Sequence, residues 1–460
     1  MKKMDLKPML KPKSVAIIGA SRDPDKVGHV ILQNYINGGY PGRLYAVNKS
    51  AEEIMGIKSY ASILDIKDSI DLAVISIPAQ FVPEALEECG KAGVKTAIVV
   101  SGGFAEIGNQ DLQDQMVKVA EKYNMPTLGP NCLGVMDPRS RVDTLFLPTY
   151  KLSRPSIGGV SFVCQSGAVG STVLDLISGE GFGLSKFISY GNAAHVDEVD
   201  ILDYLMKDPE TKVIIMYIEG IKRGKEFIEI AKKITKTKPV IVLKAGRTAA
   251  GQAAAHSHTA ALAGNYEAHE ALFRQYGFTI AEDLNDLLYY AKMLESEPMP
   301  KGGRVAIITN GGGTGVLTAD AIGMSGNLKL AQLSNSSVAA LRKVMPPLVN
   351  MRIPLDLVGD ADDKRYGDAL SILSTDDNID MLIVIILFQT PGADSKAAAR
   401  LVGFKEKSSK PMVVLSMGGD YTRMHTIMME SAGLPVYDSP TAAVRSLSEL
   451  LKYSDYISRK

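Results

Sequence analysis

Short apolar runs rich in valine and isoleucine recur along this chain of 460 residues, and many are followed at once by small residues and then by a helix-like amphipathic segment. The runs are Val15–Ile18, Leu72–Ile77, Ala97–Val100, Val160–Val163, Val213–Ile218, Val240–Leu243, Val305–Ile308, Met381–Phe388 and Met412–Leu415. A run that is apolar at every position, rather than at every second one, is typical of a strand buried on both faces of a parallel sheet. The sequence therefore predicts a repeated α/β fold.

Two stretches interrupt this pattern and are predicted to be linkers. Residues 137–156 are rich in proline and charge, and residues 296–303 contain Pro298, Pro300 and a glycine pair. A chain of this length is expected to hold about three domains at roughly 150 residues each. We therefore predict three doubly wound units, at residues 1–136, 137–297 and 298–460.

The composition excludes several classes of protein. Lys plus Arg is 51 and Asp plus Glu is 51, so the chain offers no broad basic surface for nucleic acid. Its cysteines (Cys89, Cys132 and Cys164) form no CxxC pair, which favours neither a disulfide framework nor a cysteine–zinc site. No apolar run approaches the ~18 residues of a membrane span. We expect a soluble cytoplasmic protein without a membrane or nucleic-acid partner.

The first strand-to-helix loop is a candidate nucleotide site. Gly19-Ala20-Ser21 ends the first run, and Gly28 stands close to a helix expected to begin near Val30. Because backbone N–H groups at a helix N-terminus attract phosphate, a phosphorylated nucleotide is one interpretation, and an ordinary tight turn is an equally good one. The spacing is not G-x-G-x-x-G, so the nicotinamide fingerprint is absent.

Two later loops share this chemistry. Gln165-Ser166-Gly167 and Thr309–Gly315 combine hydroxyl groups with glycines after an apolar run, so each is a candidate anion site. Each signal is weak alone, because any doubly wound domain needs small residues at such turns.

The most unusual segment is Thr248–Gly264, which consists mostly of Ala, Gly, Ser and Thr and includes His256 and His258. Imidazole is a nucleophile near neutral pH, so a catalytic histidine is one interpretation, with a metal site or a solvated Ala-rich helix as alternatives. No third His, Cys or carboxylate lies within the segment, which disfavours a metal, and we predict none. Glu219 ends an apolar run and is either a surface residue or a carboxylate that orients a histidine ring.

Taken together, these residues resemble the nucleoside-diphosphate-forming acyl-CoA synthetase family, and within it the alpha subunits of ADP-forming acetyl-CoA synthetases, which are related to succinyl-CoA synthetase. The most specific match is Ser257-His258-Thr259 followed by Leu262-Ala263-Gly264. In this family the histidine is transiently phosphorylated, which identifies His258 rather than His256. The other matching segments are Val15–Ser21, Val47-Asn48, Gly102–Phe104, Gly129–Val135, Phe162–Val169 and Tyr217–Gly220.

The resemblance implies a Rossmann-like domain that binds coenzyme A, followed by two flavodoxin-like domains, the first carrying the phosphohistidine loop. It implies His258 as the catalytic residue, Glu219 as the residue that orients it, and phosphate binding at Gln165, Ser166 and Gly167. It places coenzyme A against Gly19, Ala20, Ser21, Lys26, Gly28, Asn48, Pro78, Ser101, Gly102 and Phe104. ADP or ATP and Mg²⁺ are expected on a separate ATP-grasp beta subunit, in an α₂β₂ heterotetramer.

The implied reaction is reversible: acyl-CoA, ADP and phosphate give the acid, CoA and ATP through an acyl phosphate and a phosphohistidine. Ala260, Lys49 and Ile353 depart from the family pattern without removing a reacting group, and they leave the acyl preference open. The alternative is a CoA-binding regulatory or scaffold protein without phosphoryl transfer, which needs neither His258 nor Glu219.

Overall fold

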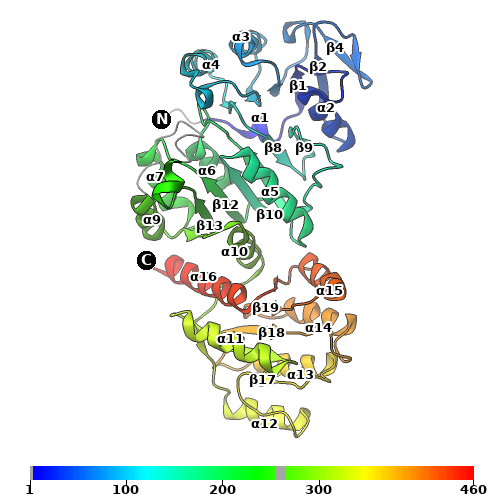
Figure 1. Ribbon diagram of the computed structural model, residues 1–460, viewed down its shortest axis with the longest axis vertical. Helices are drawn as coiled ribbons and strands as arrows, with labels where there is room; N and C mark the ends of the chain where they lie inside the picture. The colour runs from blue at the N-terminus through cyan, green and yellow to red at the C-terminus, as the bar shows by residue number, and fades with distance from the viewer. Residues whose placement is uncertain (1–3, 254–265, 460) are drawn as a thin grey trace. The chain divides into compact units, whose positions relative to one another are not determined.

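The computed structural model describes residues 4–253 and 266–459 of the chain. It divides into two compact units (Figure 1). The first comprises Met1–Ser178 and Gly183–Glu282, and the second comprises Gly179–Phe182 and Asp283–Lys460. The first unit holds two sheets and the second holds one.

The first sheet has the strand order of a Rossmann fold, β3-β4-β2-β1-β5-β6-β7, and only the β3–β4 pair is antiparallel. Its order reverses between β1 and β5, which lie side by side in parallel. The strands are β1 (Ser14–Ile18), β2 (Arg43–Val47), β3 (Glu53–Ile54), β4 (Ile57–Tyr60), β5 (Leu72–Ile75), β6 (Thr96–Val99) and β7 (Thr127–Leu128).

Helices cover both faces of this sheet. Strand β1 is apolar at every position after Ser14, so side chains on both of its faces need to be buried. Val15 and Ile17 pack in one core with α2, whereas Ala16 and Ile18 pack in another with α3 and α4. This is the two-sided burial that the continuous apolar runs predict. The helices are α1 (Lys7–Leu10), α2 (Val27–Asn37), α3 (Val82–Lys91) and α4 (Gln110–Lys122).

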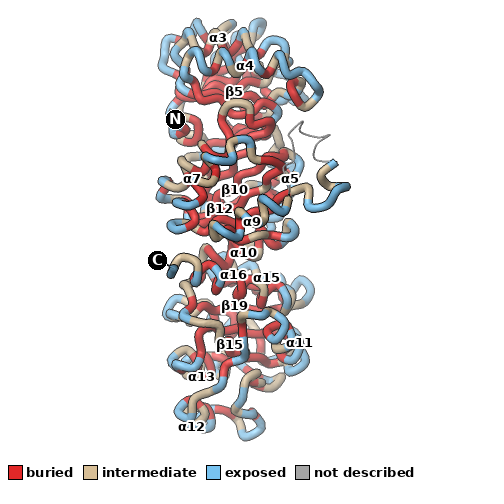
Figure 2. Tube along the Cα trace, turned by 90° about the vertical axis from the view of Figure 1, so that its left-hand side faces the viewer, coloured by how far each residue is buried: buried red, intermediate tan, exposed pale blue. Residues whose placement is uncertain are grey.

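The second sheet follows the flavodoxin-like pattern, with β10 between β11 and β12 in the order β14-β13-β12-β10-β11-β8-β9. Its strands are β8 (Gly134–Asp137), β9 (Val142–Asp143), β10 (Ile157–Cys164), β11 (Leu184–Ser189), β12 (Val213–Ile218), β13 (Val240–Lys244) and β14 (Thr279–Ile280). Its helices are α5 (Gly167–Gly179), α6 (Glu198–Lys207), α7 (Gly224–Ile234) and α9 (Tyr266–Gln275). Figure 2 shows β10 and β12 buried between more exposed helices.

The third sheet, in the second unit, is also flavodoxin-like, with the order β16-β15-β18-β19-β20 and β17 paired to β15. Its strands are β15 (Arg304–Thr309), β16 (Lys329–Leu330), β17 (Leu355–Asp356), β18 (Met381–Ile385), β19 (Met412–Leu415) and β20 (Val436–Tyr437). Its helices are α10 (Leu284–Ser296), α11 (Gly312–Met324), α12 (Asn335–Val344), α13 (Asp363–Leu373), α14 (Ser395–Lys405), α15 (Asp420–Ser431) and α16 (Pro440–Ser458).

The predicted α/β class is confirmed, and two local predictions need correction. Residues 137–156 are not only a linker, because β8 pairs antiparallel to β11 and β9 pairs antiparallel to the end of β8, which extends the second sheet. Helix α2 begins at Val27 rather than near Val30. The domain boundaries at 136 and 297 stay predictions; residue 136 lies inside β8.

Among the described residues, no helix is long and apolar enough to cross a membrane. In the same part of the chain, no group of three or more His, Cys, Asp or Glu residues is placed to hold a metal ion.

Candidate functional site

The strand order of the second sheet brings two predicted loops together. Strands β10 and β12 are adjacent and parallel, so Gln165, which follows β10, and Glu219, which follows β12, emerge at the same edge. The sheet grows outward in both directions from this pair, and such a point forms a crevice for ligands in open α/β sheets.

The side chain of Gln165 connects the two loops by hydrogen bonds. Its side-chain oxygen accepts hydrogen bonds from the backbone N–H groups of Glu219, at 2.7 Å, and Gly220, at 3.3 Å. Its own backbone N–H donates to the carbonyl of Tyr217 at 3.1 Å. Gln165 is only 5% exposed, so these bonds are made where water does not compete strongly.

The loop after β10 leads straight into the N-terminus of α5. Ser166 is buried, its hydroxyl accepts from the backbone N–H of Val169 at 3.4 Å, and its carbonyl accepts from that of Gly170 at 2.9 Å. The first turn of α5 contains no acidic residue. The positive end of the helix dipole therefore remains available to an anion near Gly167.

Glu219 is a buried carboxylate that influences its titratable neighbours. Burial raises the pKa of the Tyr217 hydroxyl, and Glu219 adds to this shift. Burial also raises the pKa of the Cys164 thiol, again with a contribution from Glu219. Burial lowers the pKa of the Lys244 ammonium group, and Glu219 opposes that shift. The Glu219 carboxylate therefore lies close to three titratable side chains at the carboxyl edge of β12.

The predicted histidines His256 and His258 lie in 254–265, outside the described residues. The chain approaches this stretch from the carboxyl end of β13, which pairs with β12 so that Lys244 lies opposite Ile218, next to Glu219. Residues 245–253, which lead from β13 to this stretch, therefore leave the sheet at the edge that holds Glu219. That Glu219 orients His258 stays a prediction.

The loop after β1 packs closely against neighbouring backbone. Gly19 has a φ of +93°, and a Cβ there would lie 2.7 Å from the carbonyl oxygen of Ser76. A Cβ on Gly28 would lie 2.1 Å from the carbonyl oxygen of Gly19. The side chain of Asn48 donates to the carbonyl of Ala20 at 2.8 Å. Four predicted residues therefore meet at the point where the strand order reverses.

The other predicted coenzyme A residues lie at the same edge with different exposure. Ser21 is partly exposed, and Lys26, which precedes α2, is exposed. Pro78 is exposed after β5, and the hydroxyl of Ser101, after β6, donates to the carbonyl of Ile77 at 2.5 Å.

Near Ser101, Gly102 is exposed, whereas the side chain of Phe104 is fully buried in the core beneath α3 and α4. Only the backbone of Phe104 is therefore suited to ligand contact. The ligand-binding roles of all ten residues stay predictions.

Sequence reasoning missed Glu106 and Asn192. The Glu106 carboxylate accepts from the backbone N–H groups of Gly103 and Phe104, and Asn192 donates to its other oxygen at 2.6 Å. Asn192 comes from the loop after β11, 86 positions further along the chain. No local spacing signals such a contact.

The glycine-rich loop after β15 is a weaker anion site than its sequence indicates. Gly311 caps α11, and its N–H donates to the Thr309 hydroxyl at 2.9 Å. A carboxylate oxygen of Asp356 lies 2.8 Å from where a Cβ on Gly312 would be. This negative charge beside the helix N-terminus opposes an anion there.

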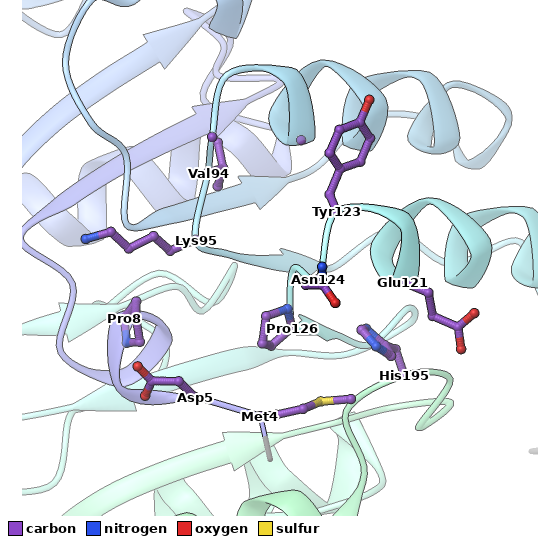
Figure 3. Close-up of a pocket in the computed structure, with 12 residues that line it drawn as sticks. Met4, Asp5, Pro8, Val94, Lys95, Glu121, Tyr123, Asn124, Pro126 and His195 are labelled. Carbon is purple, nitrogen blue, oxygen red and sulfur yellow. The ribbon is translucent and has the colours of Figure 1, made fainter. Parts of the chain in front are cut away.

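A pocket of about 700 Å³ lies at the opposite ends of the first sheet's strands (Figure 3). It is lined by Lys95 before β6, Pro126 before β7, Glu121 near the end of α4, and His195. Burial lowers the pKa of the His195 imidazole, and the N–H of Thr127 approaches its Nδ1 at 3.3 Å. None of the predicted site residues that the structure describes lines this pocket.

Family models match three parts of the chain: a CoA binding domain at residues 13–138, a succinyl-CoA ligase-like flavodoxin domain at 157–294, and a ligase-CoA domain at 305–439. The alpha subunit of acetate–CoA ligase (ADP-forming) II from Pyrococcus furiosus is 40% identical over 437 residues, which cover 93% of each chain. The chain belongs to the family of ADP-forming acetate–CoA ligase alpha subunits. The family predicted from the sequence is thereby confirmed.

Relatives in this family differ in length. An acetate–CoA ligase (ADP-forming) from Methanocaldococcus jannaschii is 39% identical over 98% of this chain, which spans only 63% of that relative. The structure of a dinucleotide-forming acetyl-coenzyme A synthetase 1 from Candidatus Korarchaeum cryptofilum, in complex with phosphate and ADP, has a TM-score of 0.92 and 36% identity, covering 99% of this chain and 98% of that one. The Rossmann-like and flavodoxin-like folds are therefore family features.

Proposed function

We propose that this chain is the alpha subunit of an ADP-forming acyl-CoA synthetase of the acetate–CoA ligase type. It converts acyl-CoA, ADP and phosphate reversibly into the acid, CoA and ATP, and it works in the cytoplasm. The observation that carries this proposal is the bond between Gln165 and the backbone of Glu219, which holds an anion-attracting helix terminus and a buried carboxylate at one sheet edge.

Coenzyme A binds at the carboxyl edge of the first sheet. The loop Gly19–Ser21 and the N-terminus of α2 are suited to its phosphate groups, because small residues expose backbone N–H groups and α2 carries no acidic residue in its first turn. The match of residues 13–138 to a CoA binding domain supports this assignment.

Phosphate binds at Gln165–Gly167, before α5. Its oxygen attacks the thioester carbonyl carbon, the C–S bond breaks, and CoA leaves as a thiolate that takes up a proton. The product is an acyl phosphate. Preorganised N–H groups contribute most to such a step by stabilising the charge on the phosphate oxygens.

His258 then takes the phosphoryl group. A ring nitrogen of His258 attacks phosphorus, the P–O bond to the acyl group breaks, and the acid leaves as a carboxylate. Glu219 accepts the other ring N–H and stabilises the positive charge on the ring. Transfer from the phosphohistidine to ADP completes the reaction.

ADP and Mg²⁺ bind to an ATP-grasp beta subunit, and the assembly is an α₂β₂ heterotetramer. The greater length of the Methanocaldococcus jannaschii relative supports a partner, since 37% of that relative lies beyond the part this chain matches. In this arrangement His258 carries the phosphoryl group between two subunits.

Reconstitution with the ATP-grasp partner tests the proposal. ATP should form from acetyl-CoA, ADP and phosphate only when both chains are present. ATP formed by this chain alone would contradict the proposal that ADP binds to the partner subunit. Binding of CoA without any ATP formation by the pair would favour the alternative, a CoA-binding regulatory or scaffold protein.

A further inference from the structure

Residues 190–196, here called the bridging segment, leave the second sheet after β11 and run along β7 of the first sheet and the chain that follows it. Three backbone hydrogen bonds join them: Asn192 N to Pro130 O at 3.0 Å, Ala194 N to Gly129 O at 3.2 Å, and Val196 N to Thr127 O at 3.1 Å. A Cβ on Gly191 would lie 2.2 Å from the carbonyl oxygen of Asn131. The two domains therefore meet here through backbone, at a distance that only glycine permits.

Asn192 is the buried centre of this contact. Its amide nitrogen donates to a carboxylate oxygen of Glu106 at 2.6 Å and to the side-chain oxygen of Gln113 at 3.0 Å. Its amide oxygen accepts from the side chain of Asn131 at 3.3 Å. Both N–H groups of the amide are thus in use, which fixes its orientation.

Glu106 connects Asn192 to the loop after β6. Its second carboxylate oxygen accepts from the backbone N–H groups of Gly103 and Phe104. Burial acts to raise the pKa of Glu106, but the hydrogen bonds from Asn192 and from the loop hold it below its usual value. The carboxylate is therefore the acceptor that shapes this loop.

The bridging segment also contacts the loop after β12. The Lys222 ammonium group donates to the carbonyls of Asn192, at 2.8 Å, and Ala193, at 3.1 Å. Lys222 lies three residues after Glu219, in the loop that Gln165 holds. One short segment thus contacts the loops of both candidate sites.

We propose that Asn192 is a positioning residue for coenzyme A: the second domain completes the coenzyme A site of the first through the bond from Asn192 to Glu106. The inference rests on the proposed function, and it adds a residue of the phosphoryl-transfer domain to the determinants of thioester binding. Loss of the bond frees Glu106 and, with it, the backbone of Gly102–Phe104.

An exchange of donor and acceptor tests this role. In Asn192→Asp two carboxylates face each other, and in Glu106→Gln two amide N–H groups do. In the double variant the new amide at position 106 still accepts from the loop through its oxygen, while its N–H group donates to the new carboxylate at position 192. Each single variant should raise the KM for CoA about ten-fold, and the double variant should return it to within about three-fold of wild type.

The readout that separates positioning from folding is the labelling of His258 from ATP in the assembled enzyme without CoA. This rate should change less than the KM for CoA does. Asn37→Asp, the same substitution at an exposed site on α2, is the matched control and should leave both quantities at wild-type values.

Two results would overturn the inference. One is a KM for CoA within two-fold of wild type in both single variants. The other is a double variant no better than the worse single variant, even if either single variant folds poorly. A wild-type enzyme that binds no CoA and makes no ATP with its partner would instead reject the proposed function.

Discussion

The side-chain oxygen of Gln165 lies 2.7 Å from the backbone nitrogen of Glu219, which joins the loops after two adjacent strands. A loop that presents N–H groups to an anion and a loop that presents a carboxylate would otherwise move independently. Their connection through a buried amide sets the spacing between the proposed phosphate position and the residue expected to orient His258.

Replacing Gln165 by leucine should slow phosphoryl transfer. The change leaves the buried N–H groups of Glu219 and Gly220 without their acceptor, which costs about 1–3 kcal/mol of stability and releases the loop. We expect His258 labelling to slow by about 10- to 100-fold, measured with radioactive ATP and the partner chain. Gln115→Leu, at an exposed position on α4, is the control. A labelling rate within two-fold of wild type would contradict the role given to Gln165.

Alanine substitutions at His256 and His258, the two histidines of Thr248–Gly264, should have different effects on labelling. His258→Ala should abolish both ATP synthesis and acid-labile labelling, whereas His256→Ala should keep the label. Label retained in His258→Ala and lost in His256→Ala would show that the phosphorylated residue is His256. No label in the wild-type enzyme during turnover would reject the phosphohistidine route.

Glu219→Gln should leave CoA binding intact and slow phosphorylation by on the order of 10²-fold, because the amide no longer stabilises a charged ring. Calorimetry with CoA and stopped-time labelling measure the two effects. Equal loss of CoA affinity and labelling would indicate that Glu219 supports the fold rather than the histidine.

Gly28→Ala should damage the coenzyme A site. The added methyl group would lie 2.1 Å from the carbonyl oxygen of Gly19, so either α2 or the loop must move. We expect the Kd for CoA, measured by calorimetric titration, to rise at least about ten-fold, with no NAD binding in either protein. In the control Gly403→Ala the new Cβ has no atom within 4 Å, and affinity should not change. Micromolar NAD binding without CoA binding would refute the cofactor assignment.

The buried carboxyl of Glu198 should make stability depend on pH. Burial and the neighbouring Asp197 raise its pKa from 4.5 to about 7 in the folded state, and Arg223 and Lys222 oppose this only partly. The folded state then holds more protons than the unfolded state between these values, so the free energy of unfolding falls as the pH rises through this window. Glu198→Gln should remove this contribution to the pH dependence and stabilise the protein at pH 8 by roughly 3 kcal/mol.

Thermal unfolding at pH 5 and pH 8 measures this effect, with Glu267→Gln, at an exposed position on α9, as the control. Glu198→Gln and wild type should differ more at pH 8 than at pH 5. An equal shift at both values would show that the carboxyl does not change protonation on folding.

The sequence was sufficient where a residue's position depends on its own strand. Gln165 and Glu219 each follow a continuous apolar run, and parallel strands place such positions at one edge. Gly19 and Gly28 were identifiable for the same reason, although their mutual contact was not. These positions follow from the continuous apolar runs and from the rule that the carboxyl ends of parallel strands lie at one edge of the sheet.

The sequence was insufficient where a contact joins distant segments. Asn192 lies on a loop of the second domain and Glu106 in a short 3₁₀ helix of the first, and neither stands in a periodic pattern or a turn signature. The short strands β8 and β9 were missed because two to four residues carry too little periodicity to outweigh the prolines around them. Such features arise from tertiary pairing alone.

Each of the two compact units consists of two separate segments of the sequence. The chain enters the second unit at Gly179, leaves it after Phe182, and returns to it at Asp283. Glu180, in the short excursion, pairs with Lys292 of α10 at 3.3 Å. A fragment that starts at Asp283 therefore lacks a piece of its own unit, and no single cut in the chain separates the two units.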